Sequence, residues 1–276
     1  MKVAVTGAVG HLGRVVCRQL LNAGHTVLAT DLRADNELGI HVEVANLVNR
    51  ESCYRLIEGA DVLVHLGNHP HALGRPAAEI YSHNVSINAN IFQAALELGI
   101  KKWIFASSIQ AMRGKRSIHN HEPSALAYLP VDGQAPYNAS NLYGLSKVAG
   151  EQMLQYYSAA EGRTTIAIRY PMLLNMAGSP FDDVWFPKPY PHLDEVFSYL
   201  DFGDAASLIL AIISTPLSGY HCYQPAAKNN LQRRPAAELI REFYPNVPLR
   251  QPIETIQHLV DLTPIEHETG WSPKYE

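Results

Sequence analysis

A glycine-rich turn near the start of the chain is the strongest constraint on the fold. Residues 6–13 read T-G-A-V-G-H-L-G and stand between a short apolar run and a segment with helical periodicity. Glycine lets the backbone turn tightly and approach a pyrophosphate without a Cβ in the way, and the following helix offers free N–H groups to an anion. Gly7, Gly10 and Gly13 in this context therefore predict a dinucleotide site at the first turn of a Rossmann-type sheet.

The first half of the chain alternates strand-like and helix-like segments, which is the pattern of β-α-β units in a parallel sheet. The predicted strands cover residues 2–6, 26–30, 41–44, 61–66, 101–107 and 164–170. The predicted helices, each with a glycine just past its end, cover residues 11–23, 50–58, 77–98 and 142–161. The pattern loosens after residue 170, and residues 205–213 are typical of one more helix.

These segments predict an α/β fold with a doubly wound parallel sheet and a small C-terminal region. We expect an NAD-binding Rossmann domain over residues 1–170. We expect residues 171–276 to be mainly a substrate-binding region, with some elements that return to the Rossmann core.

Composition and charge narrow the class of function. The chain is 47% hydrophobic and 17% charged with a formal net charge of −4, so it has a globular composition and no net basic field for nucleic acid or an anionic membrane. Its three cysteines lie far apart, which favours a reducing cytoplasm over a disulfide framework. No stretch is typical of a signal peptide or a membrane helix. We therefore expect a cytoplasmic protein that acts on a small molecule.

Asp31 ends the second predicted strand, close to the spacing of about 20 residues at which an acid binds the adenosine ribose. A carboxylate there accepts hydrogen bonds from both ribose hydroxyls and repels a 2′-phosphate, so it favours NAD. Arg33 leaves NADP open, because a guanidinium can accommodate that phosphate.

Tyr143 and Lys147 stand four residues apart in Y-G-L-S-K, so they lie on one face of a predicted helix. A nearby ammonium favours the phenolate and lowers the pKa of a tyrosine, so Tyr143 could exchange a proton with a substrate hydroxyl during hydride transfer. An amphipathic helix surface would show the same pair. Ser108 ends W-I-F-A-S-S, where its hydroxyl could donate to the reacting oxygen or simply cap the strand.

Together these motifs resemble the extended short-chain dehydrogenase/reductases, the NAD-dependent epimerase/dehydratase family. T-G-A-V-G-H-L-G is similar to the family's glycine motif, A-S-S to its serine segment and Y-G-L-S-K to its tyrosine-lysine motif. The resemblance implies a catalytic triad of Ser108, Tyr143 and Lys147. It implies cofactor contacts from the tyrosine and lysine of the triad and from Gly7, Gly10, His11, Leu12, Gly13, Asp31, Leu32, Asn46, Leu47, Leu66, Gly67, Asn84 and Pro171.

Departures from the family pattern limit the reactions and substrates that we expect. Ile109 and Gln110 stand where dehydratases of the family have adjacent Asp and Glu, so we do not expect elimination of water. We assign these two residues, with Asn68 and His71, to substrate binding. The short span between I-R-Y and D-F-G-D favours a substrate smaller than a nucleotide sugar, and the length and H-L-G turn look similar to uronate dehydrogenases.

We therefore expect an NAD-dependent oxidoreductase or epimerase that transfers a hydride between a sugar-like hydroxyl and the nicotinamide, with Tyr143 as acid/base. A redox-neutral nucleotide-sugar epimerase and a non-catalytic dinucleotide-sensing regulator remain alternatives. His69 and His71 have a spacing that can bind metal, but they lack partners in the sequence, and we expect no metal. The family often forms dimers through two long helices, which makes a homodimer an open expectation.

Overall fold

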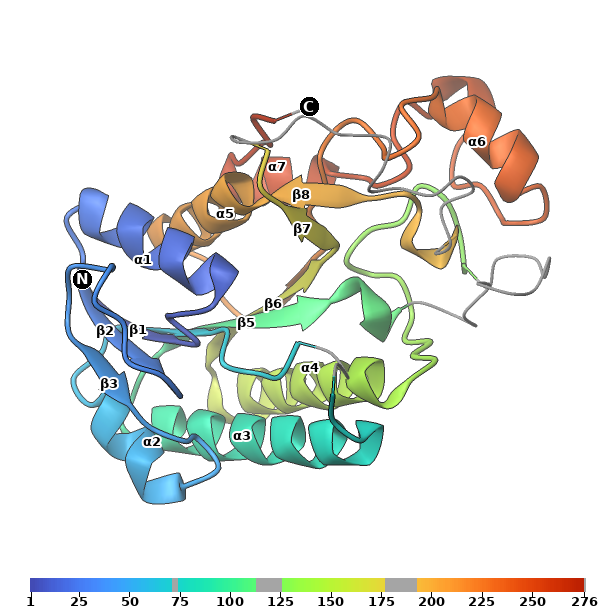
Figure 1. The fold of residues 1–276 in the computed structure, drawn as a ribbon. Coiled ribbons are helices and arrows are strands. Elements are labelled where there is room, and N and C mark those ends of the chain that lie inside the picture. Colours follow the sequence, from blue (N-terminus) through green and yellow to red (C-terminus); the bar gives the residue numbers. More distant parts are fainter. Residues whose placement is uncertain (71–73, 113–125, 177–192, 276) are drawn as a thin grey trace.

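A parallel sheet of seven strands runs through the middle of the molecule (Figure 1). The structure is a computed structural model that describes residues 1–70, 74–112, 126–176 and 193–275. In sheet order the strands are β3 (Val42–Val44), β2 (Thr26–Asp31), β1 (Lys2–Thr6), β4 (Val62–His65), β5 (Lys102–Ser108), β6 (Thr164–Tyr170) and β9 (Tyr220–Tyr223).

Helices cover both faces of this sheet, as Figure 1 shows. One face carries α1 (His11–Asn22) and α5 (Phe202–Ser214), and the other carries α2 (Arg50–Ile57), α3 (Ala77–Glu97) and α4 (Leu142–Glu161). A second, two-stranded parallel sheet pairs β7 (Met172–Leu174) with β8 (Tyr199–Asp201). Two further α-helices in the described part of the chain are α6 (Ala236–Phe243) and α7 (Thr263–Thr269). The predicted doubly wound α/β fold is confirmed, and each predicted strand and helix begins and ends within one residue of its expected bounds, apart from the start of α5.

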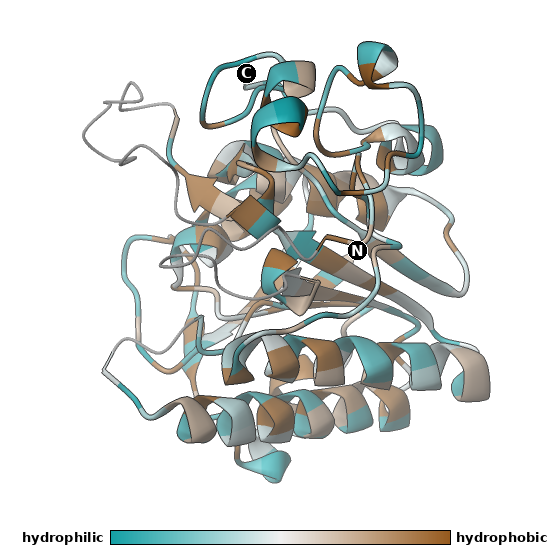
Figure 2. Cartoon of the chain, turned by 90° about the vertical axis from the view of Figure 1, so that its right-hand side faces the viewer, coloured by the Kyte–Doolittle hydropathy of each residue, from teal (hydrophilic) through white to brown (hydrophobic). Residues whose placement is uncertain are grey.

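The apolar alternation of the strands explains the two layers of core. In β1, Val3 and Val5 pack toward α1 and α5, whereas Ala4 packs toward α2 and α3. Because both faces are covered by helices, the central strands β1 and β4 are buried along nearly their whole length and are mostly apolar. Figure 2 shows this as mostly hydrophobic strands between helices that carry both hydrophilic and hydrophobic residues.

The part of the chain after residue 170 contributes to the main sheet as well as to the smaller one. Strand β9 pairs in parallel with β6 and extends the main sheet at that edge. Helix α5 begins at Phe202, three residues before the predicted start, because the Asp201 side chain accepts a hydrogen bond from the Gly203 N–H and caps the helix. Among the described residues, no helix combines the length and the apolar character needed to cross a membrane.

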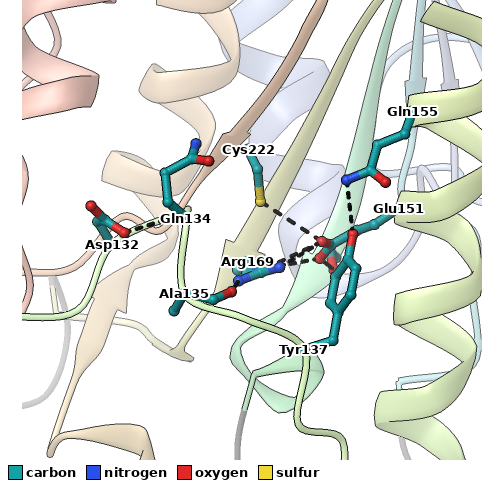
Figure 3. Close-up of polar contacts among 9 residues, drawn as sticks. Asp132, Gln134, Ala135, Tyr137, Glu151, Gln155, Arg169 and Cys222 are labelled. Atoms are coloured by element: carbon teal, nitrogen blue, oxygen red, sulfur yellow. Dashed lines mark hydrogen bonds and ion pairs between the residues drawn. The ribbon is translucent and has the colours of Figure 1, made fainter. Parts of the chain in front are cut away.

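A buried ion pair ties α4 to β6 directly behind the end of β5 (Figure 3). Arg169 donates to both carboxylate oxygens of Glu151, at 2.9 Å and 3.1 Å, and the two side chains are 3% and 0% exposed. Glu151 also accepts from the Ser107 hydroxyl, and Arg169 donates to the Ala135 carbonyl at 2.6 Å. The network thus fixes β6, the end of β5, the loop before α4 and the middle of α4 against one another.

We predict that Glu151→Gln lowers the free energy of unfolding by about 3 to 5 kcal/mol, because it leaves the buried Arg169 charge uncompensated. Chemical denaturation measured by circular dichroism checks this. The double variant Glu151→Leu, Arg169→Met should lose less stability than Glu151→Gln alone, since it removes both charges.

The matched control is Arg234→Gln, which breaks the exposed ion pairs that Arg234 forms with Glu238 and Glu242 of α6. It should lower the free energy of unfolding by less than about 1 kcal/mol. If Glu151→Gln and Arg234→Gln lower the free energy of unfolding equally, the buried pair does not stabilise the fold more than an exposed one.

Candidate active site

The glycine turn is built so that two of its glycines cannot be replaced without displacing backbone. Gly7 has a φ of +71°, and a Cβ at this position would lie 2.8 Å from the carbonyl carbon of Leu66. A Cβ on Gly13 would lie 2.1 Å from the Gly7 carbonyl oxygen, because the first turn of α1 packs directly on the turn. Gly10 is the N-cap of α1, so the first amides of the helix, which have no acceptor within the helix, lie beside it. The glycines of this turn place no side chains over its backbone, and the turn lies at a helix N-terminus, so it can accommodate a pyrophosphate.

A cavity of about 830 Å³ extends from this turn across the carboxyl ends of the strands. Most of the residues that the sequence assigned to the cofactor and the substrate line it. These residues are Gly7, Gly10, His11, Leu12, Gly13, Asp31, Leu32, Asn46, Leu47, Leu66, Gly67, Asn68, Ser108, Tyr143, Lys147 and Pro171.

Three of the assigned residues do not line the cavity, and a fourth is not among the described residues. Asn84 is buried away from the cavity, where it binds the backbone of His69. Ile109 lies in the hydrophobic core, 2% exposed. The Gln110 side chain accepts from the Asn141 amide at 2.9 Å, so it braces the start of α4. His71 lies outside the described residues.

One end of the cavity matches the adenosine part of a dinucleotide. Asp31 stands at the end of β2, and one of its carboxylate oxygens accepts from the Val9 N–H at 2.9 Å, which holds it beside the glycine turn. Arg33 also lines the cavity at this end and is exposed. Leu32 and Asn46 complete this part of the wall.

The other end of the cavity carries Ser108, Tyr143 and Lys147. Ser108 is the last residue of β5, while Tyr143 and Lys147 stand in the first two turns of α4. Asn141 starts this helix by accepting from the Gly144 N–H at 2.8 Å. The predicted placement of tyrosine and lysine on one helix face holds, with the Lys147 amino group 5.6 Å from the centre of the Tyr143 ring.

The Lys147 amino group is buried and donates to two oxygens. It reaches the Ala106 carbonyl at 2.8 Å and the Asn68 side-chain oxygen at 2.9 Å, and it lies 4.8 Å from the centre of the Phe105 ring. Burial lowers the pKa of Lys147 to about 7, and the negative charge of Glu151, one helical turn further along α4, acts in the opposite direction.

Asn68 belongs to a chain of buried side chains that begins at Lys147. Its amide nitrogen donates to the Asn88 side-chain oxygen at 2.8 Å, and that oxygen also accepts from Nε2 of His65 at 3.0 Å. Because Nε2 then carries the proton, Nδ1 of His65 accepts from the Thr6 hydroxyl at 2.6 Å. Burial lowers the pKa of His65 to about 3, so the chain is neutral beyond Lys147.

The expected lowering of the Tyr143 pKa is wrong for this site. Burial raises that pKa to about 12; a hydrogen bond with Ser108 lowers it, and the charge of Glu195 raises it further. The same burial destabilises the charged form of Lys147, so the ammonium that was expected to favour the phenolate is itself weakened.

Several residues that build this end of the site were not predicted from the sequence. Asn88 follows Asn84 by one helical turn in an otherwise apolar helix face, and this spacing of two buried amides is the one signal that was available. His83 and Arg75 line the cavity although no motif contains them. Among the described residues, no group of three or more His, Cys, Asp or Glu side chains is arranged to hold a metal ion.

Comparisons with known proteins agree with this geometry. The sequence pattern of the NAD-dependent epimerase/dehydratase family matches residues 3–181, more than half of the chain. A uronate dehydrogenase from Pseudomonas syringae pv. tomato is 29% identical over 223 residues, which cover 79% of this chain and 72% of that protein. An L-arabinose 1-dehydrogenase (NAD(P)(+)) from Haloferax volcanii is 29% identical over 181 residues, which cover 63% of this chain and 67% of that protein.

Solved structures share the fold at lower identity. UDP-glucose 4-epimerase from Bifidobacterium longum, in complex with NAD+ and UDP, has a TM-score of 0.71 and 19% identity, covering 100% of this chain and 94% of that one. A short-chain dehydrogenase/reductase superfamily protein from Agrobacterium tumefaciens with bound NAD has a TM-score of 0.72 and 18% identity, covering 100% and 93%. The expected NAD cofactor is confirmed at the level of the family. The chain belongs to the NAD-dependent epimerase/dehydratase family.

Proposed function

We propose that this protein is an NAD-dependent dehydrogenase that oxidises a hydroxyl group of a sugar-like substrate, with Tyr143 as the acid/base. The observation that carries the proposal is the convergence of Ser108, Tyr143 and Lys147 at one end of a cavity whose other end is the glycine turn and Asp31. The relatives named above, a uronate dehydrogenase and an L-arabinose 1-dehydrogenase, favour net oxidation of a sugar.

The cofactor would lie along the cavity, with its pyrophosphate on Gly10 and the start of α1 and its adenosine ribose on Asp31. Bound NAD+ accepts a hydride on its nicotinamide ring. Asp31 favours NAD over NADP, since its carboxylate would repel a 2′-phosphate, although Arg33 lies close enough in sequence to moderate that preference.

The phenolate form of Tyr143, which burial disfavours and a free N–H of Lys147 would stabilise, takes the proton of the substrate hydroxyl while the carbon of that group gives up its hydride to NAD+. The C–H and O–H bonds are thereby replaced by a carbonyl. Ser108 donates to the same oxygen and steadies its developing charge. Lys147 uses two donors on Ala106 and Asn68, so its charged form has one N–H left for the cofactor ribose or the Tyr143 oxygen.

The redox-neutral epimerase is the second candidate, because the family contains such enzymes and the fold resembles a UDP-glucose 4-epimerase. The short span between I-R-Y and D-F-G-D favours a substrate smaller than a nucleotide sugar, which makes net oxidation the better-supported reaction.

Formation of NADH with a panel of aldoses, uronic acids and polyols is the direct test. We expect NADH absorbance to rise with one class of sugar when NAD+ is added to the purified protein. No rise with any sugar, combined with NAD that is released only on denaturation, would favour the epimerase. A protein that neither binds NAD nor turns over a sugar would refute the proposal.

Tyr143→Phe should reduce turnover by about 100-fold or more, because it removes only the oxygen that moves the proton. Binding of NAD, followed by tryptophan fluorescence, should persist in the same variant. Tyr156→Phe is the matched control, since Tyr156 is 59% exposed on the same helix. If Tyr143→Phe retains turnover, Tyr143 is not the acid/base.

Variants of Asn68 should move the titration of Lys147 in opposite directions. Asn68→Asp places a carboxylate beside the amino group, which favours the ammonium, so the inflection of kcat expected near pH 7 should move up by about one unit or more. Asn68→Leu removes the acceptor, so the inflection should move down. Profiles of kcat against pH check this, and identical inflections in both variants would show that Asn68 does not position Lys147.

A further inference from the structure

Three residues of one cavity wall take no part in the proposed hydride transfer. His69 follows β4, Arg75 precedes α3, and His83 stands in the second turn of α3; we call them the basic wall. All three line the cavity described above. The rings of His69 and His83 lie 5.7 Å apart and are tilted by 38°, so the two imidazoles form one surface.

The basic wall belongs to the catalytic end of the cavity. His69 directly follows Asn68, which holds the Lys147 amino group. The Asn84 side chain donates to the His69 carbonyl at 3.1 Å and to the Ser146 hydroxyl at 3.2 Å, and that hydroxyl donates to the Tyr143 carbonyl at 2.7 Å.

The packing of the helices gives the same placement. Helices α3 and α4 lie side by side, and both begin at the same end of the molecule (Figure 1). Because His69, Arg75 and His83 line the same cavity as Tyr143, the wall borders the space in which a substrate would meet Tyr143.

The charges along the cavity differ between its two ends. Among the described residues that line it, Asp31 is the single carboxylate, and it lies at the adenosine end. At the catalytic end, Lys147 and the basic wall are the lining groups that carry or can gain a positive charge. Lys147 is already engaged with Asn68 and Ala106, so the wall is the group left to meet a negative charge on a substrate.

Glu79 is the competing partner of the wall. It lies outside the lining, pairs with Arg75 at 3.2 Å and approaches His83 to 4.0 Å. The Arg75 side chain is 47% exposed, so this ion pair is weak in water and a bound anion can replace it. Burial and the positive charges of Arg75 and His83 lower the pKa of His69, against the opposing effect of Glu79, so an added negative charge would relieve this repulsion.

We propose that His69, Arg75 and His83 form a subsite for an anionic substituent, a carboxylate or a phosphate, on the sugar whose hydroxyl is oxidised. The inference rests on the proposed function and deepens it by naming the substrate class. A planar guanidinium with two neighbouring imidazoles supplies several N–H donors, which is the chemistry that recognises such anions. The pyrophosphate of the cofactor is accounted for by the glycine turn at the start of α1, which lies on a different wall.

The test compares kcat/KM for matched sugars: D-glucuronate and D-glucose, D-galacturonate and D-galactose, and D-glucose 6-phosphate. We expect an anionic sugar to be preferred over its neutral partner by about tenfold or more, and this ratio to fall by about tenfold in Arg75→Gln and in His83→Gln. The carboxylate and phosphate probes show which anion the subsite takes. The preference should also weaken with added salt, since half-exposed charges are screened.

Arg241→Gln is the control variant, because Arg241 is a cationic side chain of similar exposure on α6, outside the cavity lining. It should leave the ratio unchanged. If kcat/KM of the native protein is the same for neutral sugars as for acidic ones, the proposal is wrong. A preference that both Arg75→Gln and His83→Gln retain would also overturn it.

If no sugar yields NADH, the proposed function fails, and the subsite is then tested separately by titration calorimetry of D-glucuronate with the NAD-loaded protein. Binding by the native protein that weakens about tenfold in Arg75→Gln supports the subsite. Absence of binding, or equal binding by both proteins, refutes it.

Discussion

The buried amino group of Lys147 is the interaction on which the geometry of the catalytic end depends. A cation inside the protein must find hydrogen-bond acceptors, because the desolvation it suffers is otherwise uncompensated. The Ala106 carbonyl and the Asn68 side chain meet this need, and Asn68 is in turn oriented by Asn88. The chain of contacts ends at Thr6, whose hydroxyl accepts from the Gly67 N–H at 3.1 Å. The hydrogen bonds that stabilise the charge of Lys147 are therefore connected to the backbone that borders the glycine turn.

Helix α4 carries the polar groups of the site at a spacing of four residues. Tyr143, Lys147 and Glu151 follow one another along the same face, and each meets a different environment. Burial raises the pKa of Tyr143 and lowers that of Lys147, while Glu151 favours the charged lysine and is itself held by Arg169. The acid/base properties of the pair thus depend on a carboxylate that lies behind the cavity rather than in it.

The sequence predicted what local patterns determine. The glycine turn, the strand and helix bounds and the shared face of Tyr143 and Lys147 follow from spacing alone, so they could be read without knowing the fold. The neutral network around Asn88 could not, because its partners come from β1, β4 and the loop after β4. Asn84 illustrates the same limit: its place in a motif indicated a cofactor contact, whereas packing turns its amide toward the His69 backbone. Burial also decided the direction of the Tyr143 pKa, and burial is a property of the folded chain.

Strand β9 has a consequence for how the polypeptide acquires its structure during synthesis. It is the neighbour of β6 on the outer side, yet some fifty residues separate the two strands along the chain. Until the ribosome has released residues 220–223, β6 is a bare edge with unpaired N–H and C=O groups that another polypeptide can join. The segment that carries every dinucleotide-binding motif is therefore not self-sufficient. A nascent chain stalled before β9 would expose the open edge of the sheet. Folding without aggregation therefore requires that β9 be synthesised and pair with β6 before another polypeptide binds to that edge.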